Sequence, residues 1–140
     1  MGYNGQSNVS MSWQTAEDLS ANQFTFVTLD TTAQLKASRP TDFATGILSN
    51  APSVGADSQY AGTVELVGVT RLAVGGVYAI GTVMVPGTDG TINGLGYSVA
   101  DATSNYKYAR AKLLEASTAA YDVVAVQLID ANPGVNSTTA

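Results

Sequence analysis

The chain contains no cysteine and no histidine among its 140 residues. These absences exclude disulfide bonds, thiolate nucleophiles, histidine-containing catalytic triads and the usual zinc ligands. A phosphate-binding loop is also missing, and Gly94 and Gly96 lack the third glycine and the following helix of a dinucleotide-binding motif. Two carboxylates could form a glycosidase pair, but solvated surface acids explain the acidic residues better. We therefore expect no enzymatic activity, no metal or other cofactor and no small-molecule substrate.

Charge is scarce as well, because only 12% of the residues are charged, about half the usual share. The net charge of −5 argues against nucleic acid as a partner, since phosphate binding uses clustered Lys and Arg. No apolar run approaches the ~20 residues that span a bilayer, and Met1–Ser12 lacks the pattern of a signal peptide. We expect a soluble protein without a membrane partner, whose largely uncharged surface suits contact with other proteins.

Strand patterns dominate what is present. Three apolar runs of strand length lie between Thr45 and Pro86, and each ends at glycine or proline. Helix is the poorer interpretation, because Val and Ile lose side-chain freedom there and each interior glycine costs about 1 kcal/mol. This stretch predicts a β meander. The predicted strands are Phe24–Leu29, Gln34–Ala37, Val64–Val74, Val77–Val85 and Val123–Ile129, and the predicted core contains Phe26, Ile47, Leu66, Val69, Ile80, Val83, Val124 and Leu128.

Two segments between the predicted strands carry their own local signals. Asp89 and Gly90 predict a two-residue hairpin, with Thr91 and Ile92 beginning the returning strand. The segment Ala109–Ala120 has a helix-forming composition, while the residues at its start alternate as a strand would. The local pattern leaves helix and strand both open there.

The length fits one domain with one core. The pattern predicts a mainly β, compact, single-domain meander of barrel or sandwich type, comprising an N-terminal arm (residues 1–22), a β domain (23–131) and a flexible C-terminal end (132–140). Thr15 could start a short helix in the arm, but no sustained periodicity follows. Four apolar side chains of the arm need cover, and we expect a partner to provide it. They are Tyr3, Met11, Trp13 and Leu19.

One set of residues carries a family resemblance over about Phe24 to Ile129. The set is Phe24–Leu29; Gly46, Ile47, Leu48, Asn50, Ala51, Pro52 and Gly55; Gly62 with the Val-rich strand to Val74; Ala79, Ile80, Gly81, Val83 and Val85; Asp89 and Gly90; Ala109, Ala111, Leu114, Glu115 and Ala116; and Val123–Leu128. In this order and spacing, the set resembles the small head decoration proteins, or capsid cement proteins, of tailed bacteriophages.

This resemblance implies a compact β domain whose closing segments alternate strand and turn, which favours a strand over a long helix at Ala109–Ala116. It also implies a structural role. The protein would be made in the host cytoplasm, bind the major capsid protein on the outer surface of the assembled head as a homotrimer, and stabilise the virion against internal DNA pressure. The four apolar arm residues would then contact the capsid.

A second function class stays open, namely a β-rich carbohydrate-binding or adhesin-like module of a virion. In that interpretation, aromatic side chains stack on sugar rings, although scattered tyrosines in a β protein more often serve packing. The aromatic candidates are Trp13, Tyr60, Tyr78, Tyr97, Tyr106 and Tyr108.

Overall fold

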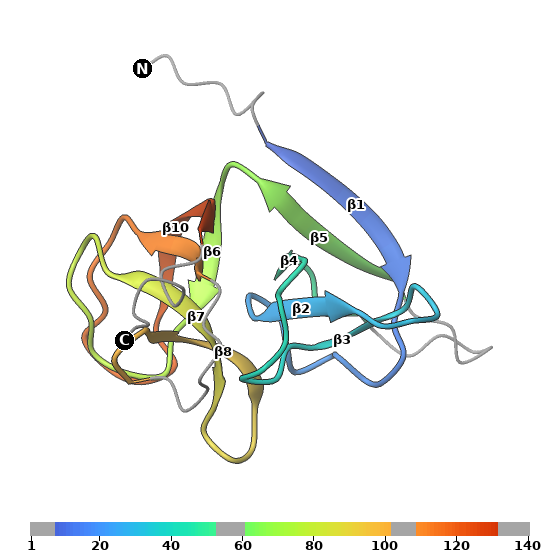
Figure 1. The fold of residues 1–140 in the computed structure, drawn as a ribbon, viewed down its shortest axis with the longest axis horizontal. Coiled ribbons are helices and arrows are strands. Elements are labelled where there is room, and N and C mark those ends of the chain that lie inside the picture. The colour runs from blue at the N-terminus through green and yellow to red at the C-terminus, as the bar shows by residue number, and fades with distance from the viewer. Residues whose placement is uncertain (1–7, 53–60, 102–108, 132–140) are drawn as a thin grey trace, which may run out of the picture.

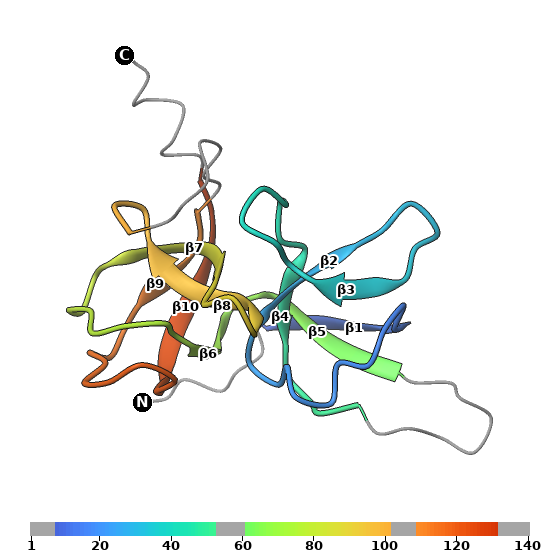
Figure 2. The same ribbon diagram turned by 90° about the horizontal axis from the view of Figure 1, so that it is seen from below.

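The computed structural model describes residues 8–52, 61–101 and 109–131, and this part of the chain is all β, with ten strands and no helix. The strands form two antiparallel five-stranded sheets that lie side by side (Figures 1 and 2). The first sheet has the order β1-β5-β4-β2-β3 and the second β6-β10-β9-β7-β8. The strands are β1 Val9–Gln14, β2 Phe26–Leu29, β3 Leu35–Ala37, β4 Gly46–Leu48, β5 Ala61–Val67, β6 Val69–Ala73, β7 Val83–Thr88, β8 Asn93–Ser98, β9 Ala109–Leu113 and β10 Val123–Ala131.

The mainly β class is confirmed, but the simple central meander is wrong. The predicted strand Val64–Val74 is two strands, β5 and β6, which belong to different sheets. The break is at Gly68, whose φ of +112° is accessible to glycine and strained for other residues. A Cβ at this position would lie 2.0 Å from Asn8 Oδ1, so both the backbone angle and the space require glycine.

Several strand limits also differ from the sequence prediction. Strand β2 begins two residues late, at Phe26, and the region before Val83 is a loop rather than the start of β7. The hairpin at Asp89 exists, but four residues connect β7 to β8, and the returning strand begins at Asn93. Ala109–Leu113 is a strand, in agreement with the alternation there.

The two sheets repeat one topology. Residues 8–67, the N-terminal half, and residues 69–131, the C-terminal half, each place their five strands in the order first, fifth, fourth, second, third. The registers correspond as well, since Phe26 pairs with Ile47 in one half and Val83 pairs with Lys112 in the other. In each half, the residue after the first strand forms an isolated parallel bridge to the third strand. The paired strand positions of one half therefore have structural counterparts in the other.

The core consists of two hydrophobic clusters, and one of them joins the halves. The first, inside the N-terminal half, is built from Leu19, Val27, Leu35, Ala37, Leu48 and Val64, with Trp13, Leu29 and Leu66 packed against it. The second contains C-terminal residues from β6, β7, β9 and β10, but also Phe26, Ala44 and Ile47 of the N-terminal half.

The predicted core was partly right. Phe26, Ile47, Val124 and Leu128 are buried, and Leu66 and Val83 are partly buried. Val69 and Ile80 are wrong, because their side chains are 43% and 67% exposed. Val69 follows the sheet-switching turn, and Ile80 lies in the loop before β7, so their β-branched side chains do not face either cluster.

Arg110 on β9 links the two halves through a buried guanidinium. Its Nε donates to the carbonyl of Ala44 (3.0 Å) and its Nη2 to the carbonyl of Thr45 (3.1 Å), both in the N-terminal half. Its Nη1 donates to the carbonyl of Ile129 on β10. The guanidinium also lies 5.7 Å from the ring centre of Phe43. One side chain thus ties β9 and β10 to the segment that leads into β4.

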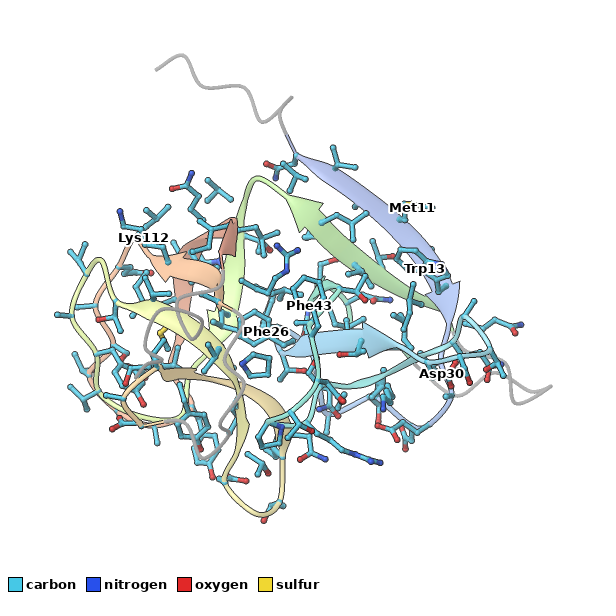
Figure 3. All side chains as sticks on the ribbon, viewed as in Figure 1. Met11, Trp13, Phe26, Asp30, Phe43 and Lys112 are labelled. Carbon is cyan, nitrogen blue, oxygen red and sulfur yellow. The ribbon has the colours of Figure 1, made fainter. Side chains whose placement is uncertain are left out.

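The predicted N-terminal arm is wrong for residues 8–22. Strand β1 pairs with β5 along its length, and Leu19 is only 1% exposed within the first cluster. Trp13 is partly buried and packs against the same cluster, so the fold itself covers it (Figure 3). The short helix proposed at Thr15 is absent from this described segment, because Thr15 forms the bridge to Leu35. Residues 1–7 and 132–140 lie outside the described residues.

The burial of Leu19 gives a direct test of this correction. Leu19→Ala should lower the free energy of unfolding by about 2–5 kcal/mol, because it leaves a cavity in the first cluster. Met11→Ala is the matched control, since Met11 is 51% exposed, and it should change stability by no more than about 0.5 kcal/mol. Urea denaturation measures both. Equal effects for the two variants would show that residues 8–22 do not belong to the folded core.

Candidate functional site

The structure separates the residues that were predicted to bind a partner. Leu19 and Trp13 are committed to the first cluster, whereas Met11 is 51% exposed on β1. Tyr3 lies outside the described residues. Of the three described candidates, Met11 is therefore the one whose side chain is available to a partner (Figure 3).

Met11 belongs to a larger apolar surface on the β1–β5 ribbon. Val9, Val67 and Val69 are 48%, 52% and 43% exposed, and Val9 stands opposite Val67 in the strand register. The Asn8 side chain holds Val69 beside them, because its amide bonds both the N–H (3.2 Å) and the carbonyl (3.1 Å) of Val69. We call Val9, Met11, Val67 and Val69 the ribbon patch. The sequence pattern placed Val69 in the core and did not single out Val9 or Val67.

The backbone of β1 is open beside this patch. In the counterpart strand β6, the backbone groups that face away from β10 bond residues of the N-terminal half. The Ala73 N–H donates to the Phe24 carbonyl (2.7 Å), and the Asn8 side chain bonds the backbone of Val69. The positions of β1 that correspond to Val69 and Arg71 are Ser10 and Ser12. Within residues 8–52, 61–101 and 109–131, the backbones of Ser10 and Ser12 have no hydrogen-bond partner on that outer side.

The sequence of β1 also lacks the usual protection of an edge strand. Natural edges carry Lys, Pro or strong bulges that prevent pairing with another chain. Strand β1 reads Val-Ser-Met-Ser-Trp-Gln, without charge or proline, and has a register shift only at its start, between Val9 and Ser10. The edge and the ribbon patch together can accept an extended segment of another protein.

A second group of side chains gathers tyrosines and aspartates on the C-terminal half. Tyr78 Oη donates to Asp101 Oδ2 (2.9 Å), and Tyr121 Oη donates to Asp89 Oδ2. The Tyr97 ring packs so closely on two glycines that a Cβ on Gly75 or Gly87 would lie 2.2 Å or 2.4 Å from it. Tyr97 also interacts electrostatically with Tyr78, Tyr121 and Asp89, so these groups form one cluster.

Hydrogen bonds and burial set the pKa values in this cluster. The hydrogen bond from Tyr121, followed by those from the Ile92 and Thr91 N–H groups, lowers the pKa of Asp89 to about 2. Burial, followed by the hydrogen bond to Asp101, raises the pKa of Tyr78 to about 12. Tyr121 was not selected from the sequence, and Tyr60, Tyr106 and Tyr108 lie outside the described residues.

Comparison with protein-family models, with curated proteins and with solved structures finds no match to this chain. The described segments contain no helix long and apolar enough to span a membrane. The same segments contain no group of three or more acidic side chains placed to hold a metal ion. Inference about function therefore starts from the exposed surfaces.

The Asp89 pKa predicts a loss of stability in acid. The folded-state pKa of about 2 lies below the ordinary aspartate value of 3.8, so the contribution of this carboxylate is present above about pH 4 and lost as the pH falls toward 2. Asp89→Asn should flatten the pH dependence of the free energy of unfolding in this window. Tyr121→Phe removes the donor and should reproduce part of the flattening. Urea titrations at pH 2 to 5 test this, and a wild-type slope in both variants would contradict it.

Proposed function

We propose that this chain is a structural phage protein that binds the outside of the assembled capsid and stabilises it. The observation that carries the proposal is the ribbon patch beside the open edge of β1, on a chain that has few charges. Such a surface loses little hydration free energy when another protein covers it, and it gains backbone hydrogen bonds if that protein supplies a strand. The resemblance to head decoration proteins supplies the identity of the partner, the major capsid protein.

The described geometry favours a preformed attachment site rather than a flexible arm. Trp13 and Leu19 hold β1 in place, so the ordering cost of a free segment does not oppose binding. A capsid repeats the same subunit many times, and a homotrimer on its surface would engage several subunits at once. Modest affinity at each site would then give strong total attachment. The site of action in this proposal is the outer surface of the virion.

Capsid binding by a Met11→Glu variant tests this function. A carboxylate in the ribbon patch should weaken binding at least tenfold, because it would have to be desolvated against an apolar surface. Thr31→Glu, on an exposed turn of the same half, is the matched control for added charge and should bind like the wild type. Co-sedimentation with purified mature capsids measures both variants.

Two results would contradict different parts of this proposal. Wild-type saturation by Met11→Glu at the same protein concentration would remove the ribbon patch as the attachment site. Failure of the wild-type protein to sediment with any mature capsid of tailed phages would remove the function itself.

The tyrosine–aspartate cluster favours carbohydrate binding as a second candidate. Aromatic rings stack on sugars, and carboxylates such as those of Asp89 and Asp101 accept hydrogen bonds from sugar hydroxyls. Tyr121 is 55% exposed beside Asp89. If the protein is a glycan-binding module, it should retain specific glycans on an array, and Tyr121→Ala should reduce that retention at least tenfold. Met11→Glu should retain them fully, and a blank array would exclude this candidate.

A further inference from the structure

The second sheet carries an exposed face on the side away from the second cluster. Side chains of a strand point alternately to its two sides, so the neighbours of buried residues such as Leu72 and Val126 point outward. The register aligns these outward side chains across three strands, because Val69 on β6 stands opposite Gln127 on β10, which stands opposite Lys112 on β9. Five exposed side chains form this surface, which we call the basic face: Val69, Arg71, Lys112, Val123 and Gln127.

Two cations on this face have no partner in the fold. Arg71 and Lys112 are both exposed, and neither forms an ion pair with any of the described residues. Two other basic side chains behave differently, since the Lys36 ammonium lies 3.6 Å from Asp42 Oδ2 and the Arg110 guanidinium is buried. In a chain with only 6 Lys and Arg residues, two free cations on one flat surface are a concentration of positive charge.

The basic face has the opposite sign of charge from the whole chain. Glu115 borders it, where its Oε1 accepts a hydrogen bond from the Ala125 N–H (3.0 Å). The two cations and this one carboxylate give the face a net charge of +1, whereas the chain has a net charge of −5. A partner surface rich in carboxylates is therefore steered to this face and away from the acidic remainder of the molecule.

The counterpart of the basic face is an interface inside the chain. In the register of the two sheets, Phe26 and Ile47 are the counterparts of Val83 and Lys112. Phe26 and Ile47 are fully buried, because residues of the C-terminal half pack over them in the second cluster. In contrast, Lys112 is exposed and Val83 is only partly buried. This side of the sheet therefore packs on protein in one half and is left open in the other.

The basic face continues the ribbon patch without a break. Val69 belongs to both surfaces, and Gln127 stands directly opposite it. Figure 3 shows Met11 of the ribbon patch and Lys112 of the basic face on either side of the turn that joins β5 to β6. A protein that covers the ribbon patch therefore meets the first residue of the basic face in the same contact.

We propose that the protein surface bound at the ribbon patch extends over the basic face and carries carboxylates that pair with Arg71 and Lys112. The inference rests on the proposed function and adds the chemistry of the partner to it. The Cα atoms of Arg71 and Lys112 lie about 12 Å apart, because two strand spacings of ~4.8 Å separate them across the sheet and two residues of ~3.3 Å along it. The partner therefore presents acidic side chains at a similar spacing, with apolar atoms against Val69 and Val123.

Carboxylates of a protein fit this surface better than the phosphates of a nucleic acid. Phosphate binding draws on many clustered cations, and here two cations stand on a chain with a net charge of −5. The exposed valines of the face also need apolar cover, which a phosphate backbone does not provide. The planar guanidinium of Arg71 can bond both oxygens of one carboxylate, which fixes the orientation of the partner.

Neutralising the two cations tests the proposal. The double variant Arg71→Gln, Lys112→Gln should weaken co-sedimentation with mature capsids by about tenfold or more, because two ion pairs are lost from the contact. It should also lose most of the salt dependence that the wild-type protein shows between about 0.05 and 0.5 M NaCl. The matched control is Lys36→Gln, Arg39→Gln, which removes the same charge from the N-terminal half and should bind like the wild type. Thermal unfolding checks that both variants are folded.

Three results would contradict the inference in different ways. Wild-type capsid binding and salt dependence in the double variant would overturn the inference and leave the ribbon patch as the attachment site. Absence of wild-type binding to any mature capsid of tailed phages would overturn the inference together with the proposed function. Retention of the wild type by a short DNA duplex, lost in the double variant, would assign the basic face to phosphates instead of carboxylates.

A chemical cross-link identifies the partner groups directly. A water-soluble carbodiimide activates a carboxyl group, and a lysine amine in contact displaces the activated group to form an amide while a urea leaves. In the capsid-bound protein, mass spectrometry should find Lys112 Nζ joined to an Asp or Glu of the major capsid protein. Lys36 is the internal control, because its ammonium already lies 3.6 Å from Asp42 within the chain. Absence of any link from Lys112 to a capsid carboxyl, in particles that carry the bound protein, would overturn the proposal.

Discussion

The buried guanidinium of Arg110 constrains the whole arrangement of the two halves. Burying a cation costs free energy unless its donors are satisfied, and here the donors bond the carbonyls of Ala44, Thr45 and Ile129. These carbonyls meet at one point only when β9 and β10 lie against the segment before β4. A lysine could not bond all of them with a planar fork. The orientation of the halves is therefore fixed by one side chain together with the packing of Phe26.

Side-chain sizes differ between counterpart positions of the two halves. The N-terminal half fills its own cluster with Trp13 and Leu35. Their counterparts in the C-terminal half are Leu72 and Gly96, and a Cβ on Gly96 would lie 2.6 Å from Leu72. At these two positions the C-terminal half carries the smaller side chains, and Phe26 from the N-terminal half packs into its cluster. The two halves therefore share one hydrophobic cluster.

The sequence predicted the class of the fold because β-branched runs and glycine punctuation are local signals. It could not predict the change of sheet at Gly68, which depends on a backbone angle, or the repeated topology, because counterparts such as Ile47 and Lys112 have unrelated chemistry. Trp13 and Leu19 stand in a polar segment that has no periodic pattern of apolar residues, so tertiary packing decides their burial. Ile80 was assigned to the core because isoleucine favours strands, but it lies in a loop and its side chain is exposed. The candidate surfaces were therefore visible only after the fold was known.

The low charge of the exposed surfaces affects how this protein can associate with other proteins. An uncharged edge such as β1 and the apolar ribbon patch beside it favour contact with protein, but they would favour indiscriminate association as well. Hydrogen bonds within the fold limit such association at one edge strand. On the counterpart edge strand β6, Asn8 bonds Val69 and the Phe24 carbonyl accepts from the Ala73 N–H, so the fold covers these backbone groups. Among the described residues, the outward-facing backbone groups of Ser10 and Ser12 on β1 stay without a hydrogen-bond partner beside the ribbon patch, so a protein that adds a strand there would contact both features.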